Sequence, residues 1–157
     1  MDYLEFGVAN GESLNWWLLN LPSSHVRFYG FDTFNGLPEK FGKFKKGDMN
    51  GKGISITDPR CQFIIGMFQD TLIPFLKQYD SSRYKIIHMD ADLYSSTLFV
   101  LMALTPYLHK DDIIIFDEFN VPLHEFRAFM DWVKALYIEY EVIIAVNNFH
   151  QIAMILT

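Results

Sequence analysis

The chain has 157 residues, half of them hydrophobic, and carries a net charge of −6. We expect one domain spanning residues 1–157, because this size and apolar content suffice for a sizeable core. The acidic balance argues against nucleic acid or an anionic membrane as a partner, since both attract basic proteins. The longest apolar run, residues 98–104, is far shorter than the ~20 residues that cross a bilayer. With its single cysteine, the chain is predicted to be cytoplasmic.

Apolar stretches of strand length alternate with helical patterns. We expect strands at residues 3–8, 26–31, 62–65, 84–89, 113–116, 141–146 and 151–156. We expect helices at residues 13–21, 71–79, 96–108 and 124–137. This alternation predicts a doubly wound, mostly parallel α/β sheet with helices on both faces. The link at residues 147–150 is too short for a parallel crossover, so the last two strands are predicted to form an antiparallel hairpin.

Aromatic residues make up 17% of the chain, and several recur at helical spacing. Most of these rings are predicted to lie in the core, namely Trp16, Trp17, Phe126, Phe129 and Trp132. The high aromatic content also predicts some exposed rings, at a substrate pocket or at a contact between copies of the chain.

Residues 39–59 show no periodicity and contain four glycines and five lysines. Long irregular segments in compact domains are commonly functional covers or disordered. We expect a flexible loop, either simply solvated or covering an anionic substrate.

The first predicted strand runs into a glycine-containing bend. Glu5 lies near the strand end, Gly7 and Gly11 follow, and Ser13 opens the helix. Such a bend suits a bound nucleoside, because glycine permits close approach and a helix start offers free N–H groups. The alternative is an ordinary turn between a strand and a helix. Asp32 ends the next strand and is predicted either to accept ribose hydroxyls or to cap its turn.

Acidic residues follow two further strands. Asp90 ends one of them, and Asp117 and Glu118 end the other. If these strands are neighbours, the three carboxylates meet at the edge where open α/β sheets bind ligands. Oxygen ligands favour Mg²⁺ or another hard divalent cation, whereas the alternative is that each acid caps a helix. Asp92 completes a short D-x-D pattern that could hold a metal–diphosphate.

Other side chains are candidates for ligand contact or catalysis. Phe68, or Met67 beside it, could pack against an adenine ring. His124 follows the second acidic pair and is a candidate general base, so we name Asp90 and His124 as catalytic candidates. His88 lies within an apolar strand and is predicted to be a core residue with its hydrogen bonds satisfied.

Four blocks of sequence together resemble the class I S-adenosylmethionine-dependent methyltransferases, and more narrowly the macrocin O-methyltransferase family. The blocks begin at Glu5-Phe6-Gly7, Gly30-Phe31-Asp32-Thr33-Phe34, Gly66 and His88, and the last includes Asp92-Leu93-Tyr94-Ser95-Ser96-Thr97 before Phe116-Asp117-Glu118. The resemblance implies a Rossmann-like, seven-stranded sheet whose last strand is antiparallel. It also implies methyl transfer from S-adenosylmethionine to a substrate hydroxyl held by Mg²⁺.

The resemblance also implies roles for particular residues. Contacts to the cofactor would come from Glu5, Gly7, Ser13, Asp32 and Thr33, and the metal ligands would be Asp90, Asp117 and Glu118. Members of the family usually carry helices before the first strand, whereas the first strand here begins at about residue 3, so the domain is expected to lack them.

We therefore expect a metal-assisted O-methyltransferase acting on a hydroxyl of a sugar-containing or polyhydroxylated small molecule. One alternative is a non-catalytic module that only binds S-adenosylmethionine. Another is a glycosyltransferase that uses its D-x-D pattern to hold a nucleotide-sugar.

Overall fold

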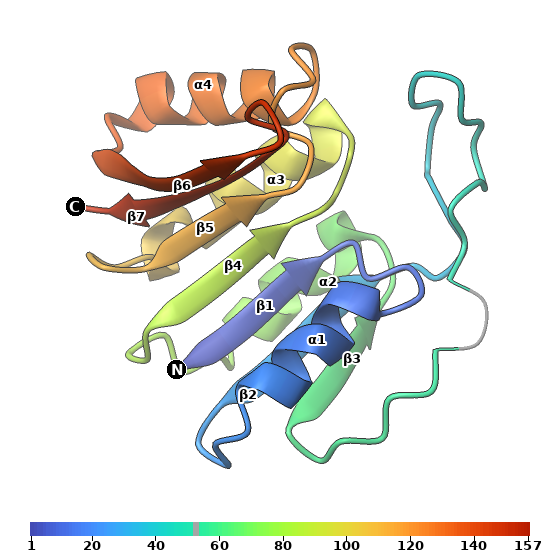
Figure 1. Cartoon of the computed structure of the whole chain (residues 1–157), viewed down its shortest axis with the longest axis vertical. Coiled ribbons are helices and arrows are strands. Elements are labelled where there is room, and N and C mark those ends of the chain that lie inside the picture. Colours follow the sequence, from blue (N-terminus) through green and yellow to red (C-terminus); the bar gives the residue numbers. More distant parts are fainter. Residues whose placement is uncertain (52–53) are drawn as a thin grey trace.

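In a computed structural model of the protein, which describes residues 1–51 and 54–157, seven strands form one sheet in the order β3-β2-β1-β4-β5-β7-β6 (Figure 1). The strands are β1 Asp2–Phe6, β2 Arg27–Asp32, β3 Cys61–Ile65, β4 Lys85–Met89, β5 Ile113–Phe116, β6 Tyr140–Val146 and β7 Gln151–Leu156. Strand β7 is antiparallel to both β5 and β6, and the pairs among β1 to β5 are parallel. The predicted sheet with its antiparallel last strand is confirmed.

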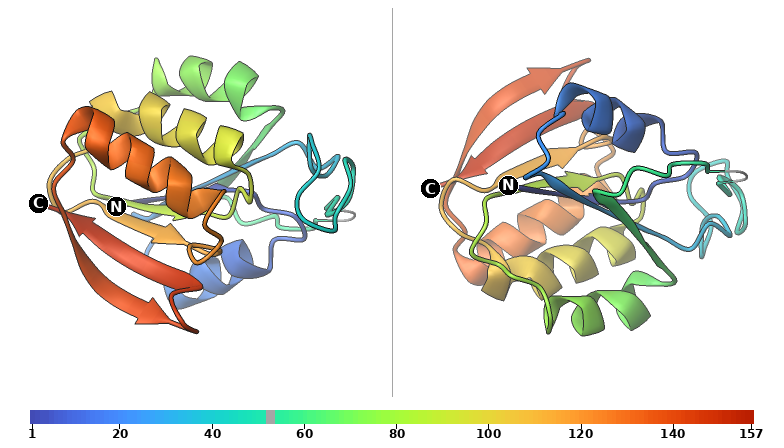
Figure 2. Two further views of the ribbon diagram at one scale, coloured as in Figure 1. Left: turned by 90° about the horizontal axis from the view of Figure 1, so that it is seen from above. Right: turned by 90° about the horizontal axis from the view of Figure 1, so that it is seen from below.

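Helices lie on both faces of the sheet, as predicted. They are α1 Glu12–Asn20, α2 Phe68–Leu76, α3 Tyr94–Leu104 and α4 Glu125–Leu136, with a short 3-10 turn η1 at Thr105–Tyr107. Figure 2 shows α2, α3 and α4 together on one face and α1 alone on the other. Leu14 and Leu18 of α1 are buried against Tyr3 and Phe28 of the sheet. Among the residues that the structure describes, no helix is long and apolar enough to cross a membrane.

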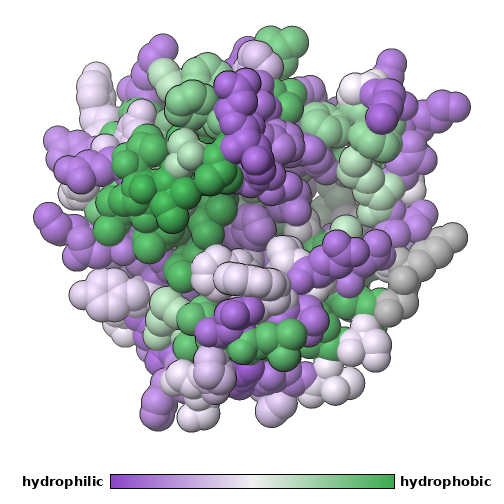
Figure 3. All heavy atoms as spheres, in the orientation of Figure 1, coloured by the Kyte–Doolittle hydropathy of each residue, from purple (hydrophilic) through white to green (hydrophobic). Residues whose placement is uncertain are grey.

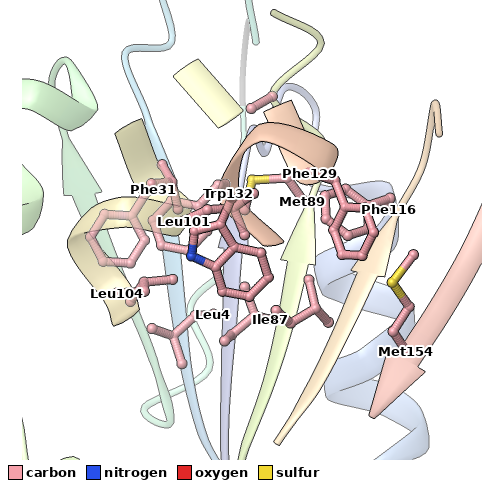
Figure 4. Packing of buried hydrophobic residues seen from close by; sticks show 14 of the residues in the cluster. Leu4, Phe31, Ile87, Met89, Leu101, Leu104, Phe116, Phe129, Trp132 and Met154 are labelled. Atoms are coloured by element: carbon pink, nitrogen blue, oxygen red, sulfur yellow. The ribbon is translucent and has the colours of Figure 1, made fainter. Parts of the chain in front are cut away.

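The main core lies between the sheet and the three helices on one face (Figure 4). Phe129 and Trp132 of α4 are buried there, as predicted, and the Trp132 Nε1–H donates to Thr105 Oγ1 at 2.8 Å. The prediction was wrong for Trp16 and Phe126, which are 55% and 39% exposed. Helical spacing alone does not distinguish the face of α1 that meets the sheet from the face that meets solvent.

The topology places a ligand site at one edge of the sheet. The chain leaves β1 through α1 toward β2, whereas the connection through α2 returns to β4 on the other side of β1. Ligands of open α/β sheets bind where the strand order reverses in this way, beyond the carboxyl ends of the strands. The long connection between β2 and β3 extends past this edge (Figure 1). Within it, Lys52 and Gly53 lie outside the described residues.

Candidate active site

A cavity of about 370 Å³ opens at this edge, a size typical of small-molecule sites. Figure 3 shows the surface hollowed between the β2–β3 connection and the body of the molecule. The predicted site residues that line the cavity are Gly7, Asp32, Thr33, Phe68, Asp90 and Glu118. The predicted site residues that are not among its lining residues are Glu5, Gly11, Ser13, Asp117 and His124.

The bend after β1 packs tightly against the loop after β4. Gly7 has φ +94°, and a β-carbon at this position would lie 1.8 Å from the carbonyl oxygen of Asp90. Glycine is therefore required here both for its backbone conformation and for the close approach. At the start of α1, a β-carbon on Gly11 would meet the Ile54 side chain at 2.8 Å, so Gly11 packs against the β2–β3 connection.

Asp32 holds the bend through its carboxylate. Its Oδ2 accepts hydrogen bonds from the backbone N–H groups of Val8 and Ala9, each at 2.8 Å, and its Oδ1 accepts one from Phe34 at 2.7 Å. Both oxygens thus bind backbone groups, while the residue still lines the cavity. Thr33 beside it donates to the carbonyl of Gly36 at 3.3 Å. The ribose contact predicted for Asp32 and Thr33 stays a prediction.

Glu5 belongs to a buried polar network under α1. Its Oε1 accepts a hydrogen bond from Ser13 Oγ at 2.8 Å, and its Oε2 accepts one from the Tyr3 hydroxyl. His88 Nδ1 lies 2.7 Å from the Tyr3 oxygen, so the prediction of a hydrogen-bonded core histidine is confirmed. Burial disfavours a charged imidazole, but the neighbouring carboxylates of Glu5, Asp90 and Asp117 together outweigh it and raise the pKa of His88. Glu5 and Ser13 thus bond to each other, where the sequence predicts cofactor contacts for them.

Acidic side chains gather where β4 and β5 end. Burial and the charge of Asp117 raise the pKa of Asp90 to about 7. Burial and a hydrogen bond with Glu118 raise the pKa of Asp92 to about 8. Burial also raises the pKa of Glu118, because a charged carboxylate loses hydration there. The cavity therefore has an acidic wall whose carboxyl groups lose their protons at a higher pH than ordinary carboxyl groups.

Glu125 was missed by the sequence reasoning. It is completely buried at the first position of α4, where its carboxylate accepts hydrogen bonds from the N–H of Glu118 at 3.1 Å and of Ala91 at 3.4 Å. It thereby ties together the loops that follow β4 and β5. In the sequence Glu125 is only an acid in the first turn of a helix. The helix dipole favours such acids on the surface as well, so the sequence does not reveal that Glu125 is buried.

The three predicted metal ligands do not form a ready-made site. Within residues 1–51 and 54–157, no three His, Cys, Asp or Glu side chains are arranged so that they could hold a metal ion. Asp117 accepts a hydrogen bond from Gln151 Nε2 at 3.1 Å and does not line the cavity, whereas Asp90 and Glu118 do. The metal site predicted for Asp90, Asp117 and Glu118 therefore stays a prediction. One feature still suits a cation, since Glu118 Oε2 is buried with no hydrogen-bond partner among the described residues.

His124 contacts the connection between β2 and β3. Its ring packs edge-on against Phe41 with centroids 4.8 Å apart, and its buried Nδ1 has no hydrogen-bond partner in the described part of the chain. A positive charge on His124 would lower the pKa of Asp92. His124 does not line the cavity, whereas Asp92 does, so the catalytic role predicted for His124 stays a prediction.

The β2–β3 connection forms the remaining wall. Met49 and Asn50 line the cavity, and Phe41 packs with Leu93 in a small apolar cluster. Ser95 Oγ at the start of α3 donates to Glu39 Oε1 at 2.8 Å, which fastens the connection across the opening. The lysines of this segment that the structure describes are exposed, namely Lys40, Lys43, Lys45 and Lys46.

Comparisons with known proteins agree with this arrangement. A family model described as a methyltransferase domain matches residues 4–119. The calicheamicin methyltransferase CalS11 is similar in fold, with a TM-score of 0.77, 22% identity and coverage of 98% of this chain and 71% of that chain. The O-methyltransferase NovP gives a TM-score of 0.70 at 19% identity, over 97% of this chain and 70% of that one.

A third similar structure is an O-methyltransferase from Bacillus cereus in complex with SAH. It gives a TM-score of 0.61 at 14% identity, over 99% of this chain and 73% of that one. No curated protein matches the sequence at a significant level.

Proposed function

Since the chain belongs to the methyltransferase domain family and has the fold of class I S-adenosylmethionine-dependent methyltransferases, we propose that it methylates a hydroxyl group of a sugar-containing small molecule. The observation that carries this proposal is the cavity itself, which joins a glycine bend on one side to an acidic wall on the other. Similar structures include an enzyme described as a TDP-rhamnose 3'-O-methyltransferase. The family match and this similar structure are both described as methyltransferases, so they point away from the glycosyltransferase alternative.

The cofactor would occupy the part of the cavity near β1 and β2. There Gly7 lines the cavity without a side chain, and Phe68 offers an aromatic ring that packs edge-on against Phe6 with centroids 5.6 Å apart. A glycine and a half-buried aromatic ring in the cavity wall suit a nucleoside, so these residues fit the cofactor. When bound, S-adenosylmethionine supplies an electrophilic methyl group on its sulfonium.

The acidic wall would bind the acceptor and take its proton. Asp92 lines the cavity, and its pKa of about 8 lies near the operating pH, which suits a general base. Its backbone has φ +57°, an uncommon conformation for a residue other than glycine and one that recurs at functional sites. Asp92 is the proposed acceptor of the proton that the acceptor hydroxyl gives up, and the catalytic role predicted for His124 stays a prediction.

A divalent cation is the finer part of the proposal. Mg²⁺ is commonly held by one or two carboxylates, with water and substrate oxygens completing its shell, so a three-carboxylate protein site is not required. The buried Oε2 of Glu118 and the cavity-lining Asp90 are the residues that would hold it, with Asp117 beside them. When bound, the cation would lower the pKa of an acceptor hydroxyl.

The test is a transfer assay preceded by a binding measurement. Calorimetry with S-adenosylmethionine and S-adenosylhomocysteine, each with and without Mg²⁺, establishes whether the cofactor binds. Incubation with S-adenosylmethionine and TDP-rhamnose or other sugar-containing acceptors is followed by mass spectrometry for a methylated product. Absence of cofactor binding would contradict the proposal. Binding without transfer to any acceptor would favour the non-catalytic module.

A further inference from the structure

A short hairpin with several lysines lies within the connection between β2 and β3. It comprises residues 37–48, and we call it the lysine arm. It contains two acids, Glu39 and Asp48, and four exposed lysines, namely Lys40, Lys43, Lys45 and Lys46. Because the whole chain has a net charge of −6, the arm is a positive segment on an otherwise acidic protein.

Backbone hydrogen bonds close the lysine arm into a hairpin. The N–H of Leu37 donates to the carbonyl of Asp48 at 2.8 Å, and the N–H of Gly47 donates to the carbonyl of Leu37 at 2.9 Å. Nearer the tip, Phe41 and Phe44 exchange two backbone hydrogen bonds, at 3.1 and 2.8 Å. The fold therefore keeps the four lysines close together, although like charges at short range repel.

The acids of the arm do not neutralise its lysines. Glu39 accepts the hydrogen bond from Ser95, and the Asp48 carboxylate accepts one from the backbone N–H of Lys45 at 2.7 Å. Within residues 1–51 and 54–157, no carboxylate oxygen lies within 4 Å of any of these four ammonium groups. A folded cluster of positive charges without counter-charges favours an anionic ligand.

The lysine arm lies beside the acidic wall of the cavity, beyond the carboxyl ends of the strands (Figure 1). Its base lines the cavity through Pro38, and Lys40 follows two residues later, a span of at most ~7 Å. Its tip packs through Phe41 in one apolar cluster with Leu93, the residue directly after Asp92. The arm and the acidic wall are therefore close enough to bind two ends of one small molecule.

We propose that the lysine arm binds the diphosphate of a nucleoside diphosphate-sugar whose sugar hydroxyl lies at the acidic wall. Such a molecule has hydroxyl groups at one end and several negative charges beyond them, which matches an acidic wall beside a positive arm. A neutral glycoside has no group that pairs with the lysines. Lysine binds phosphate as a point charge, so the arm requires no bidentate geometry.

This inference names the class of acceptor for the reaction proposed above, and it rests on that proposal for the role of the acidic wall. A nucleic acid matches the site less well than a single nucleotide-sugar. Its many phosphates would extend beyond the arm over a chain whose net charge is −6.

The test measures binding of thymidine diphosphate (TDP) by calorimetry. S-adenosylhomocysteine is present at saturation, so that the probe does not enter the nucleoside side of the cavity. Combining Lys40→Gln, Lys45→Gln and Lys46→Gln is expected to weaken TDP binding at least ~10-fold, because three positive charges near the diphosphate are lost. Lys43 is retained because its Nζ lies 5.3 Å from the centre of the Phe44 ring and supports the hairpin.

The matched control combines Lys77→Gln, Lys110→Gln and Lys134→Gln, three exposed lysines outside the arm. It changes the net charge of the chain by the same amount and is expected to bind TDP as the wild-type chain does. Circular dichroism melting verifies that both triple variants are folded. Raising the salt concentration from about 0.05 to 0.5 M is expected to weaken wild-type binding, since salt screens exposed charges.

Methyl transfer distinguishes this inference from the proposed reaction. TDP-rhamnose is expected to react with a kcat/KM at least ~10-fold above that of methyl rhamnoside, the same sugar without the diphosphate. Arm-dependent TDP binding without any methyl transfer would support the diphosphate site and contradict the reaction. Absence of TDP binding, equal binding by the arm variant and the wild-type chain, or equal transfer to both acceptors would overturn the inference. The last of these results would leave the reaction intact.

Discussion

A side chain on Gly7 would place its β-carbon 1.8 Å from the carbonyl oxygen of Asp90. This contact joins the end of β1 to the end of β4, the two strands between which the strand order reverses. The glycine bend and the acidic wall of the cavity therefore meet at this backbone contact. Any residue with a β-carbon at position 7 must push the two loops apart.

We expect Gly7→Ala to lower the free energy of unfolding by ~3 kcal/mol, because a left-handed conformation and a backbone clash are combined. Gly47→Ala is the matched control. Gly47 has φ +89°, close to the +94° of Gly7, but a β-carbon there would meet nothing within 4 Å. Only the conformational cost of ~1 kcal/mol is expected for it. Urea unfolding measures both, and equal losses would show that the Asp90 contact is unimportant.

Glu125 gives a second prediction. Glu125→Ala is expected to cost ~2 kcal/mol or more, because the buried N–H groups of Glu118 and Ala91 lose their acceptor. The exposed Glu12, also an acid in the first turn of a helix, is the control, and Glu12→Ala is expected to cost under ~1 kcal/mol. Thermal and urea unfolding compare the two variants. A similar small loss in both would mean that Glu125 does not hold the two loops.

Stability is expected to fall as the pH rises from about 4 to 8. Asp90 and Asp92 have pKa values of about 7 and 8 in the folded chain, above the ordinary value of 3.8. Between these limits the folded state binds more protons than the unfolded state, so raising the pH favours unfolding. Unfolding by urea at several pH values measures the slope. Asp92→Asn removes one of the two groups and is expected to flatten it; an unchanged slope would contradict the proton on Asp92.

The proposed cation gives a fourth prediction. Glu118→Gln is expected to reduce Mg²⁺-dependent methyl transfer at least ~10-fold, because the buried Oε2 loses its charge. Affinity for S-adenosylmethionine should change little, since Glu118 belongs to the acidic wall, where the acceptor is proposed to bind. Asp131→Asn, on the exposed part of α4, serves as control. Full activity in the presence of a chelator would show that the reaction needs no divalent cation.

The order of strands and helices was predictable from hydrophobic periodicity, and the hairpin was predictable from the length of its loop. The short link at residues 147–150 sufficed for the antiparallel hairpin, which the pairing of β6 with β7 confirms. The acids at the strand ends were also predictable as a cluster, since parallel strands end at one edge.

The roles of individual acids were less predictable. Glu5 lies two residues before Gly7 in sequence, but strand alternation turns it with Tyr3 toward α1 and away from the cavity. Asp117 and Glu118 are adjacent, yet only Glu118 lines the cavity. Such choices depend on side-chain partners from distant segments, as for Asp117 with Gln151, which no local spacing reveals.

The clamp made by Glu125 has a consequence for how the acceptor site could diversify. Because one carboxylate fixes both loops of the acidic wall, a change in either loop disturbs the other, and the reactive side of the cavity tolerates few alterations. The opposite wall around Met49 and Asn50 is attached separately, for example through the exposed hydrogen bond between Ser95 and Glu39. New acceptor preferences are therefore expected to arise by exchange of residues in that wall, with the chemistry left intact.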